Sequence, residues 1–186
     1  MDTNRLLRII WACGPTFAVC LLGTGCEAKM TLSPDLKPLD SISFSIKGRV
    51  ICDGSPEYLP RTIVKADDAG LTFRYVHQES YGKNNVPELI TLYSPATLLG
   101  VPMGTDDLVM AGQLDVMSGT QTHRSYKALC VMKNTRNIFT EGETFTAMRR
   151  RGLLALRDNL DAQLHQDRAF LEKVQALPPT ATAATR

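Results

Sequence analysis

Residues 41–52 read Ser-Ile-Ser-Phe-Ser-Ile-Lys-Gly-Arg-Val-Ile-Cys, and apolar and polar side chains alternate along most of this stretch. The apolar residues that share one face are Ile42, Phe44, Ile46, Val50 and Cys52. A period of two is typical of a β-strand with one buried face. The stretch therefore predicts a strand, and it directs the Cys52 side chain toward the core.

Further segments with strand-like composition follow this one. They are Arg61–Ala66, Leu71–Gln78, Glu88–Tyr93, Leu108–Val116 and Ser125–Lys133. Residues 67–70 and 118–121 are rich in turn formers, so each predicts a hairpin between the segments that flank it. Cys130 shares a face with Met132 in the last segment and also points toward the core. We expect about six strands over residues 41–140, in an antiparallel sheet or a small sandwich.

The period of the apolar residues changes near the C-terminus. Residues spaced by three, four or seven positions are Leu153, Leu156, Leu160, Leu164, Leu171 and Val174. This spacing predicts one long amphipathic helix over about residues 143–176. Pro178 and Pro179 would end the helix, which leaves residues 178–186 as a disordered tail. The expected fold is α+β, with a single globular domain over residues 41–177.

Length and charge restrict the class of protein. The chain has 186 residues, of which 44% are hydrophobic, as in one globular domain preceded by a targeting segment. Its formal net charge is only +2, which argues against a nucleic-acid partner.

The first 25 residues have the features of an export signal. Arg5 and Arg8 precede the uncharged residues 9–25, and small residues close the segment. The sequence Leu22-Gly23-Thr24-Gly25-Cys26 resembles the lipobox of bacterial lipoproteins, although that family more often carries Leu where this chain has Gly23. An uncleaved membrane anchor, or an ordinary signal peptide cut elsewhere, is compatible with the same segment.

The lipobox resemblance implies removal of residues 1–25 and a lipid such as palmitate on Cys26. Residues 26–40, which include Pro34 and Pro38, would then form a lipidated tether. In enteric bacteria, Glu27 after the cysteine implies the periplasmic face of the outer membrane, with retention in the inner membrane as the alternative.

The cysteine count suggests a disulfide in such an exported protein. Cleavage removes Cys13 and Cys20, and the lipid occupies Cys26. Cys52 and Cys130 remain, and in an oxidising compartment we expect them to be bonded to each other.

The sequence offers little evidence of catalysis. His77, His123 and His165 have no partners at metal-ligand spacing, so we expect neither a metal nor another cofactor. Ser80 and Lys83 match a serine-lysine motif without its companion motifs, and we expect no catalytic residues.

Two features of the predicted helix are candidate partner contacts. Arg149, Arg150 and Arg151 either contact an anionic lipid headgroup, lipopolysaccharide or an acidic protein face, or are simply solvated around the helix. Leu164 and Leu171 either pack on the sheet or dock a partner helix.

These observations favour a non-catalytic binding or assembly accessory of an envelope complex, held to the membrane by Cys26 and binding another envelope protein. One alternative is a small-ligand carrier with an apolar cavity lined by Phe44, Phe73 and Leu114. The other alternative is an envelope hydrolase, which would need His123 and the pair Asp106-Asp107 together in a cleft.

The Cys26 hypothesis gives a direct test. Replacing Cys26 with Ser removes the thiol that takes the lipid, so we expect the protein to leave the membrane fraction. Cell fractionation followed by immunoblotting measures this, with Cys52→Ser as the control. Full retention of Cys26→Ser in the membrane fraction would refute the lipid anchor.

Overall fold

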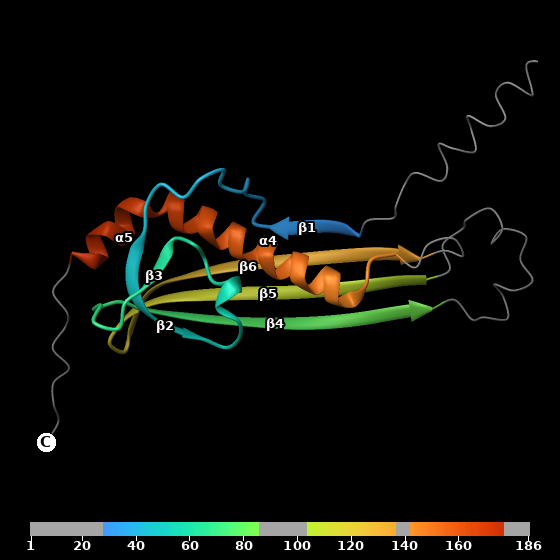
Figure 1. The fold of residues 1–186 in the computed structure, drawn as a ribbon, viewed down its shortest axis with the longest axis horizontal. Coiled ribbons are helices and arrows are strands. Elements are labelled where there is room, and N and C mark those ends of the chain that lie inside the picture. The colour runs from blue at the N-terminus through green and yellow to red at the C-terminus, as the bar shows by residue number, and fades with distance from the viewer. Residues whose placement is uncertain (1–27, 86–103, 137–141, 177–186) are drawn as a thin grey trace, which may run out of the picture.

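The computed structural model describes residues 28–85, 104–136 and 142–176, so the predicted signal segment, Cys26, the predicted strand 88–93 and the tail 178–186 lie outside the described residues. The described chain forms a six-stranded mixed sheet with two C-terminal helices against one face (Figure 1). The strand order is β1-β6-β5-β4-β2-β3. Bounds of the strands are β1 Lys29–Ser33, β2 Ile46–Cys52, β3 Ile63–Lys65, β4 Thr72–Asn85, β5 Gly104–Ser118 and β6 Gln121–Arg136.

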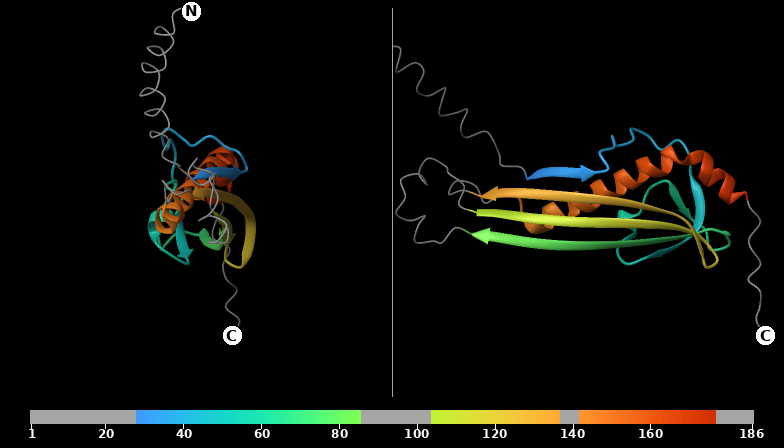
Figure 2. Two further views of the ribbon diagram at one scale, coloured as in Figure 1. Left: turned by 90° about the vertical axis from the view of Figure 1, so that its right-hand side faces the viewer. Right: turned by 180° about the vertical axis from the view of Figure 1, so that it is seen from behind.

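Three long antiparallel strands, β4, β5 and β6, form most of the sheet (Figure 2). The predicted hairpin of residues 108–116 with 125–133 is confirmed, and both strands are longer than expected. A turn joins β5 to β6 through Gly119 and Thr120, and Gly119 has a φ of 58°. Glycine adopts this left-handed conformation without steric cost, which suits a two-residue hairpin turn.

The other predicted hairpin is wrong, because β2 lies between β3 and β4 and runs parallel to both. The sheet is therefore mixed rather than purely antiparallel. A close contact explains how β2 fits beside β4. A side chain on Gly48 would place its Cβ 2.3 Å from the Phe73 ring, so only glycine lets β2 approach. The turn residues between β3 and β4 belong to a crossover instead of a hairpin.

Strand β1 corrects the predicted tether. Lys29–Ser33 pair antiparallel with β6, in the register Lys29 opposite Lys133 and Ser33 opposite Leu129. The sheet thus begins three residues after Cys26. The prolines that suggested a tether, Pro34 and Pro38, lie after this edge strand instead of before the domain.

The predicted single C-terminal helix is two helices. Helix α4 spans Phe145–Gln166 and is capped by Thr144, whose hydroxyl accepts a hydrogen bond from the backbone N–H of Ala147 at 3.3 Å. Asp167, with φ −95° and ψ 16°, separates it from α5, Arg168–Gln175. The break lets α5 turn toward β2, which it contacts.

The hydrophobic core lies between the helices and one face of the sheet, here called the inner face. Fully buried core side chains include Phe73, Leu108, Met110, Leu114, Cys130, Met132, Leu153, Leu156, Leu160 and Leu164. The strand residues among them alternate along β4, β5 and β6, as the period of two predicts. The strand predicted over residues 41–52 forms only over Ile46–Cys52, and its phase there is confirmed, since Ile46 and Gly48 are buried and Lys47 and Arg49 are exposed.

The buried carboxylate of Asp161 joins α4 to the turn before β3. One oxygen accepts the backbone N–H of Arg61 at 3.1 Å, and the other accepts the backbone N–H of Thr62 at 3.0 Å. The Thr62 hydroxyl donates a third bond at 2.8 Å, and the Arg61 guanidinium a fourth at 3.1 Å. Asp161 and Thr62 are completely buried, so these bonds satisfy groups that water does not reach.

The predicted disulfide between Cys52 and Cys130 is wrong, because both residues are free thiols. Cys52 ends β2 and Cys130 lies in β6, and the strand order places β4 and β5 between them. Three strand spacings amount to about 14 Å, and a disulfide needs Cα atoms within about 7 Å. Strand phase was predicted correctly for both cysteines, but the order of the strands was not available from it.

Asp161 also gives a stability prediction. Asp161→Ala leaves two buried backbone N–H groups without acceptors, so we expect it to lower the free energy of unfolding by about 3 kcal/mol or more. Urea unfolding followed by circular dichroism measures the change. Asp158→Ala is the matched control, because Asp158 lies one turn away and pairs with part-exposed Arg61 at 3.3 Å. A loss at Asp161 no larger than at Asp158 would contradict the role assigned to this carboxylate.

Candidate binding site on the open face of the sheet

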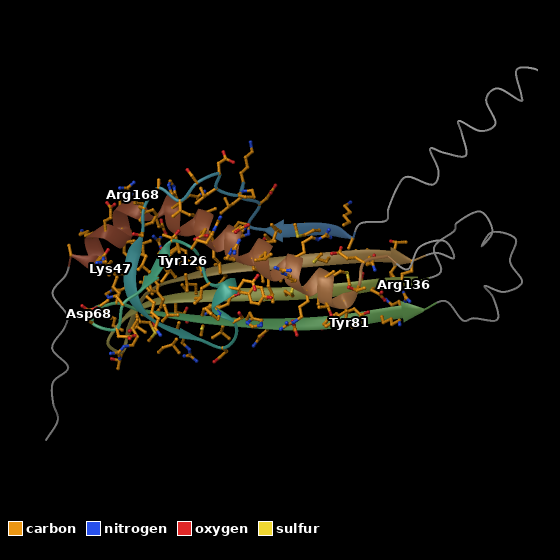
Figure 3. All side chains as sticks on the ribbon, in the orientation of Figure 1. Lys47, Asp68, Tyr81, Tyr126, Arg136 and Arg168 are labelled. Carbon is orange, nitrogen blue, oxygen red and sulfur yellow. The ribbon has the colours of Figure 1, made fainter. Side chains whose placement is uncertain are left out.

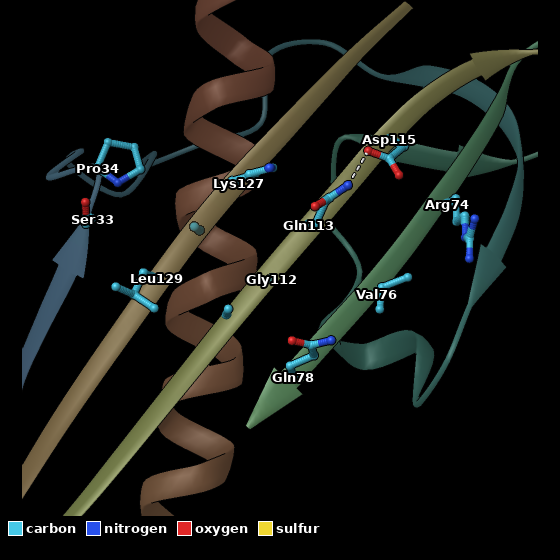
Figure 4. A pocket seen from close by; sticks show the side chains of 12 residues that line it. Ser33, Pro34, Arg74, Val76, Gln78, Gly112, Gln113, Asp115, Lys127 and Leu129 are labelled. Carbon is cyan, nitrogen blue, oxygen red and sulfur yellow. Dashed lines mark hydrogen bonds between the residues drawn. The ribbon is translucent and has the colours of Figure 1, made fainter. Parts of the chain in front are cut away.

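The helices leave the second face of β4, β5 and β6 uncovered, and we call it the outer face. Figure 4 shows it with α4 on the far side of the strands. Residues that alternate with the core positions reach it, so Arg74, Val76 and Gln78 of β4 lie beside the outward residues of β5. The outer face is therefore a direct product of strand alternation.

A hollow of about 580 Å³ lies on this face. Val76, Ala111 and Leu129 contribute apolar atoms to it, and Arg74, Gln78, Gln113, Asp115 and Lys127 contribute polar ones. Toward the β1 end, Val109, Leu129 and Val131 are 38%, 40% and 37% exposed. These three large apolar side chains are neighbours across β5 and β6, since Val109 pairs with Val131. An apolar area open to water on a sheet face is typical of an interaction surface.

One acidic group of the hollow is already held by its neighbours. A carboxylate oxygen of Asp115 accepts a hydrogen bond from the Gln113 amide at 2.9 Å and another from the Ser125 hydroxyl at 2.6 Å (Figure 4). Asp115 lies opposite Arg74 in the register of β4 and β5. No ion pair joins these two side chains among the described residues.

A second hollow, of about 470 Å³, adjoins the first and shares Arg74 with it. Arg49, Ile51 and Asp53 also line it. Ile51 is 51% exposed, the largest exposure among the large apolar residues of the described chain. The two hollows are therefore neighbours on the outer face, with Arg49 and Arg74 toward the β2 end and Leu129 toward β1.

The arginine cluster predicted as a partner contact is engaged within the molecule. Arg149 pairs with Glu79 at 2.6 Å, Arg150 with Glu57 at 3.4 Å, and Arg151 with Glu143 at 2.9 Å. Their carboxylate partners lie in three different segments, β4, the 3-10 turn Pro56–Tyr58 and the residue before the N-cap of α4. The three arginines therefore form no shared basic surface, and a contact of any of them with a partner stays a prediction.

The apolar stripe of the C-terminal helices, for which packing on the sheet and docking of a partner helix were both considered, belongs to the core. Leu164 and Leu171 are completely buried, and Val174 is 6% exposed. The break at Asp167 is the physical reason, because it lets α5 fold back over β2 where a continuous helix would project. The burial of these residues agrees with the other alternative, in which they pack on the sheet.

The residues that would support catalysis are not brought together. Asp106 lies near one end of β5, where it bonds to Arg136 at 3.1 Å, and His123 lies near the opposite turn of the hairpin. Ser80 and Lys83 belong to one extended strand, three positions apart, so their side chains point to opposite faces. In the described part of the chain, no group of three or more His, Cys, Asp or Glu residues is placed to hold a metal ion.

One polar contact has no signal in the sequence. The Ser43 hydroxyl lies 2.6 Å from Nε2 of His165, and the Phe44 ring packs edge-on against the same imidazole. The two residues are 122 positions apart. This contact fastens the segment before β2 onto α4 at an exposed position.

The three residues expected to line the cavity of a ligand carrier belong to the core or pack on it. Phe73 and Leu114 are completely buried in the core, and Phe44 packs against that core. The hollow of the outer face is lined by the residues that alternate with Phe73 and Leu114 along β4 and β5, and so lies on the other side of the sheet from them.

No helix in the described part of the chain combines the length and the apolar character needed to cross a bilayer.

Comparison with known proteins leaves the family open. No protein-family model matches the chain, and no curated protein matches it. Rare lipoprotein B from Shewanella oneidensis is a solved structure that aligns with 69% of this chain and 98% of its own, at 13% identity and a TM-score of 0.36. A TM-score this low establishes neither a shared fold nor a shared function.

The two free thiols differ in environment, which predicts a difference in reactivity. Burial raises the pKa of Cys130 to about 11, although nearby Arg151 lowers it in part. The reactive thiolate forms only as pH approaches that pKa, so at pH 8 we expect folded Cys130 to resist a maleimide while half-buried Cys52 reacts. In urea without reductant, both should react. Mass spectrometry counts the labels. Absence of both labels after unfolding would show that Cys52 and Cys130 are bonded after all.

Proposed function

We propose that the protein is a lipid-anchored, non-catalytic component of the bacterial cell envelope that binds another envelope protein through its outer face. The observation that carries the proposal is the uncovered sheet face with three exposed apolar neighbours, Val109, Leu129 and Val131. The core is complete on the opposite face, so these side chains contribute nothing to it. Their burial in a complex removes apolar area from water, which favours association.

The proposed anchor fits the position of β1. Two residues, Glu27 and Ala28, separate Cys26 from Lys29, and the three extended Cα–Cα steps between them span roughly 10 Å. A lipid on Cys26 would hold the β1 end of the sheet close to the membrane surface. Glu27 supports the periplasmic face of the outer membrane as the location, by the sorting rule of enteric lipoproteins.

A small-ligand carrier is the second candidate. The hollow of about 580 Å³ lies within the range of roughly 300–1,000 Å³ typical of small-molecule sites. Such sites usually bury most of the ligand, whereas this hollow is lined mainly by one face of a sheet. A protein partner covers an open face more completely than a small molecule does.

The proposal is tested by affinity purification of the tagged full chain from cross-linked, detergent-solubilised envelopes. Leu129→Glu places a charge in the centre of the apolar area and should remove a stoichiometric protein partner. Val64→Glu is the matched control, since Val64 of β3 is 42% exposed and lies outside the outer-face hollow. We expect Val64→Glu to keep the partner, and Cys26→Ser to lose or weaken it.

Recovery of the wild-type protein without any partner would contradict the assembly role. Equal partner recovery with Leu129→Glu and Val64→Glu would contradict the assigned face. The first outcome directs attention to the carrier alternative, and extraction of the purified protein for bound small molecules would then follow.

A further inference from the structure

We propose that the outer face binds an acidic segment of its protein partner, with a carboxylate seated on Arg49 and Arg74. This inference rests on the proposed function and specifies the chemistry of the partner. Both arginines line the hollow of about 470 Å³, and Arg74 also lines the larger hollow beside it.

The arginines of the described chain divide sharply by location. Those that form ion pairs with carboxylates are Arg61, Arg124, Arg136, Arg149, Arg150, Arg151, Arg157 and Arg168. Within the described residues, only Arg49 and Arg74 form no ion pair, and both reach the outer face. The chain therefore supplies an acidic partner to every described arginine except the two beside the hollows.

Exposed lysines extend the positive charge along the same face. Lys127 lines the large hollow, and Lys29 and Lys133 face each other across β1 and β6. The acidic residues on this face are fewer: Asp107 and Asp115 of β5, and Asp53, which lines the hollow beside the two arginines. Asp115 already accepts two hydrogen bonds from its neighbours. The positive charge is thus in excess and attracts an anionic partner.

A guanidinium group selects among anionic partners. Its planar fork of N–H donors matches a carboxylate in a bidentate geometry, and such charge-assisted bonds are about twice as strong as neutral ones. Arg49 lies beside Thr72 in the register of β2 and β4, two residues before Arg74. One acidic side chain, or two acidic residues close together, can therefore engage both arginines.

The centre of the hollow favours a peptide over an acyl chain. The Gln78 and Gln113 amides and the Asp115 carboxylate line it together with Val76 and Ala111. An acyl chain laid there would remove these polar groups from water without replacing their hydrogen bonds, which costs free energy. A peptide backbone supplies both donors and acceptors along its length.

The register also sets a spacing for the bound segment. Arg74 and Gln78 are four residues apart on β4, about 13 Å, and Gln78 lies level with Ala111 and Leu129. An extended segment with a carboxylate on Arg74 therefore brings a residue about four positions away over the apolar area. We expect an acidic residue and a large apolar residue at that separation in the partner.

Photo-cross-linking in living cells tests the proposal. The full chain carries p-benzoylphenylalanine at position 129, and the adduct is measured with arginine or with Glu or Gln at position 74. We expect Arg74→Glu to lower the protein adduct about tenfold or more, and Arg74→Gln to lower it less. Arg168→Glu is the matched control, because Arg168 is 48% exposed and belongs to α5, away from the outer face (Figure 3). Circular dichroism melting of each variant confirms that the domain is folded.

Mass spectrometry then locates the cross-linked segment of the partner. Reversing its acidic residue to Arg should restore the adduct of Arg74→Glu, which a merely structural role of Arg74 would not allow. An adduct with a lipid mass, an equal loss with Arg168→Glu, or no rescue by the reversed partner would overturn the proposal. If Leu129→Glu loses the partner but Arg74→Glu does not, the inference about an acidic segment is wrong. The proposed binding role of the outer face would then still hold.

Discussion

Four hydrogen bonds to the buried carboxylate of Asp161 join the C-terminal helix to the turn that starts β3, about one hundred positions earlier in the chain. The arrangement of both layers depends on this contact. It fixes α4 against the parallel end of the sheet, while Thr144 begins the helix at the other end, near β6. A helix held at both ends on the inner face completes the core there. The opposite face of the same strands is then left with no element of the described chain to cover it.

Each strand presents alternate side chains to the two faces of the sheet, and these two sets of side chains differ in chemistry. Inward residues in the middle of β4, β5 and β6 are apolar, and the charged inward residues Glu79 and Asp106 pair with Arg149 and Arg136. Outward residues mix amides, lysines and the two arginines that form no ion pair with exposed valine and leucine. The contacts that stabilise the fold therefore lie on one side of the sheet, and the side chains that could bind a partner lie on the other.

The sequence predicted those features of the fold that depend only on neighbouring residues. The alternation in residues 41–52 and in the β5–β6 hairpin was correct in phase, because strand periodicity depends only on neighbouring residues. The position of β2 between β3 and β4 was not predicted, since it depends on the contact of Gly48 with Phe73. The order of the strands, which local patterns do not determine, also separates Cys52 from Cys130 by three strand spacings. Val109, Leu129 and Val131 carried a weak signal, as apolar residues on the polar side of an alternating strand, but their exposure required the position of the helix.

The edge strand β1 has a consequence for the order of maturation. It begins three residues after Cys26, and it is paired with β6 along its whole length. If Cys26 is the cleavage and lipidation site, the enzymes that process it need an accessible, extended backbone up to that cysteine. A closed sheet so near the bilayer would hinder their approach. The segment that is synthesised first would therefore join the sheet last, so that attachment to the membrane and completion of the fold become one event.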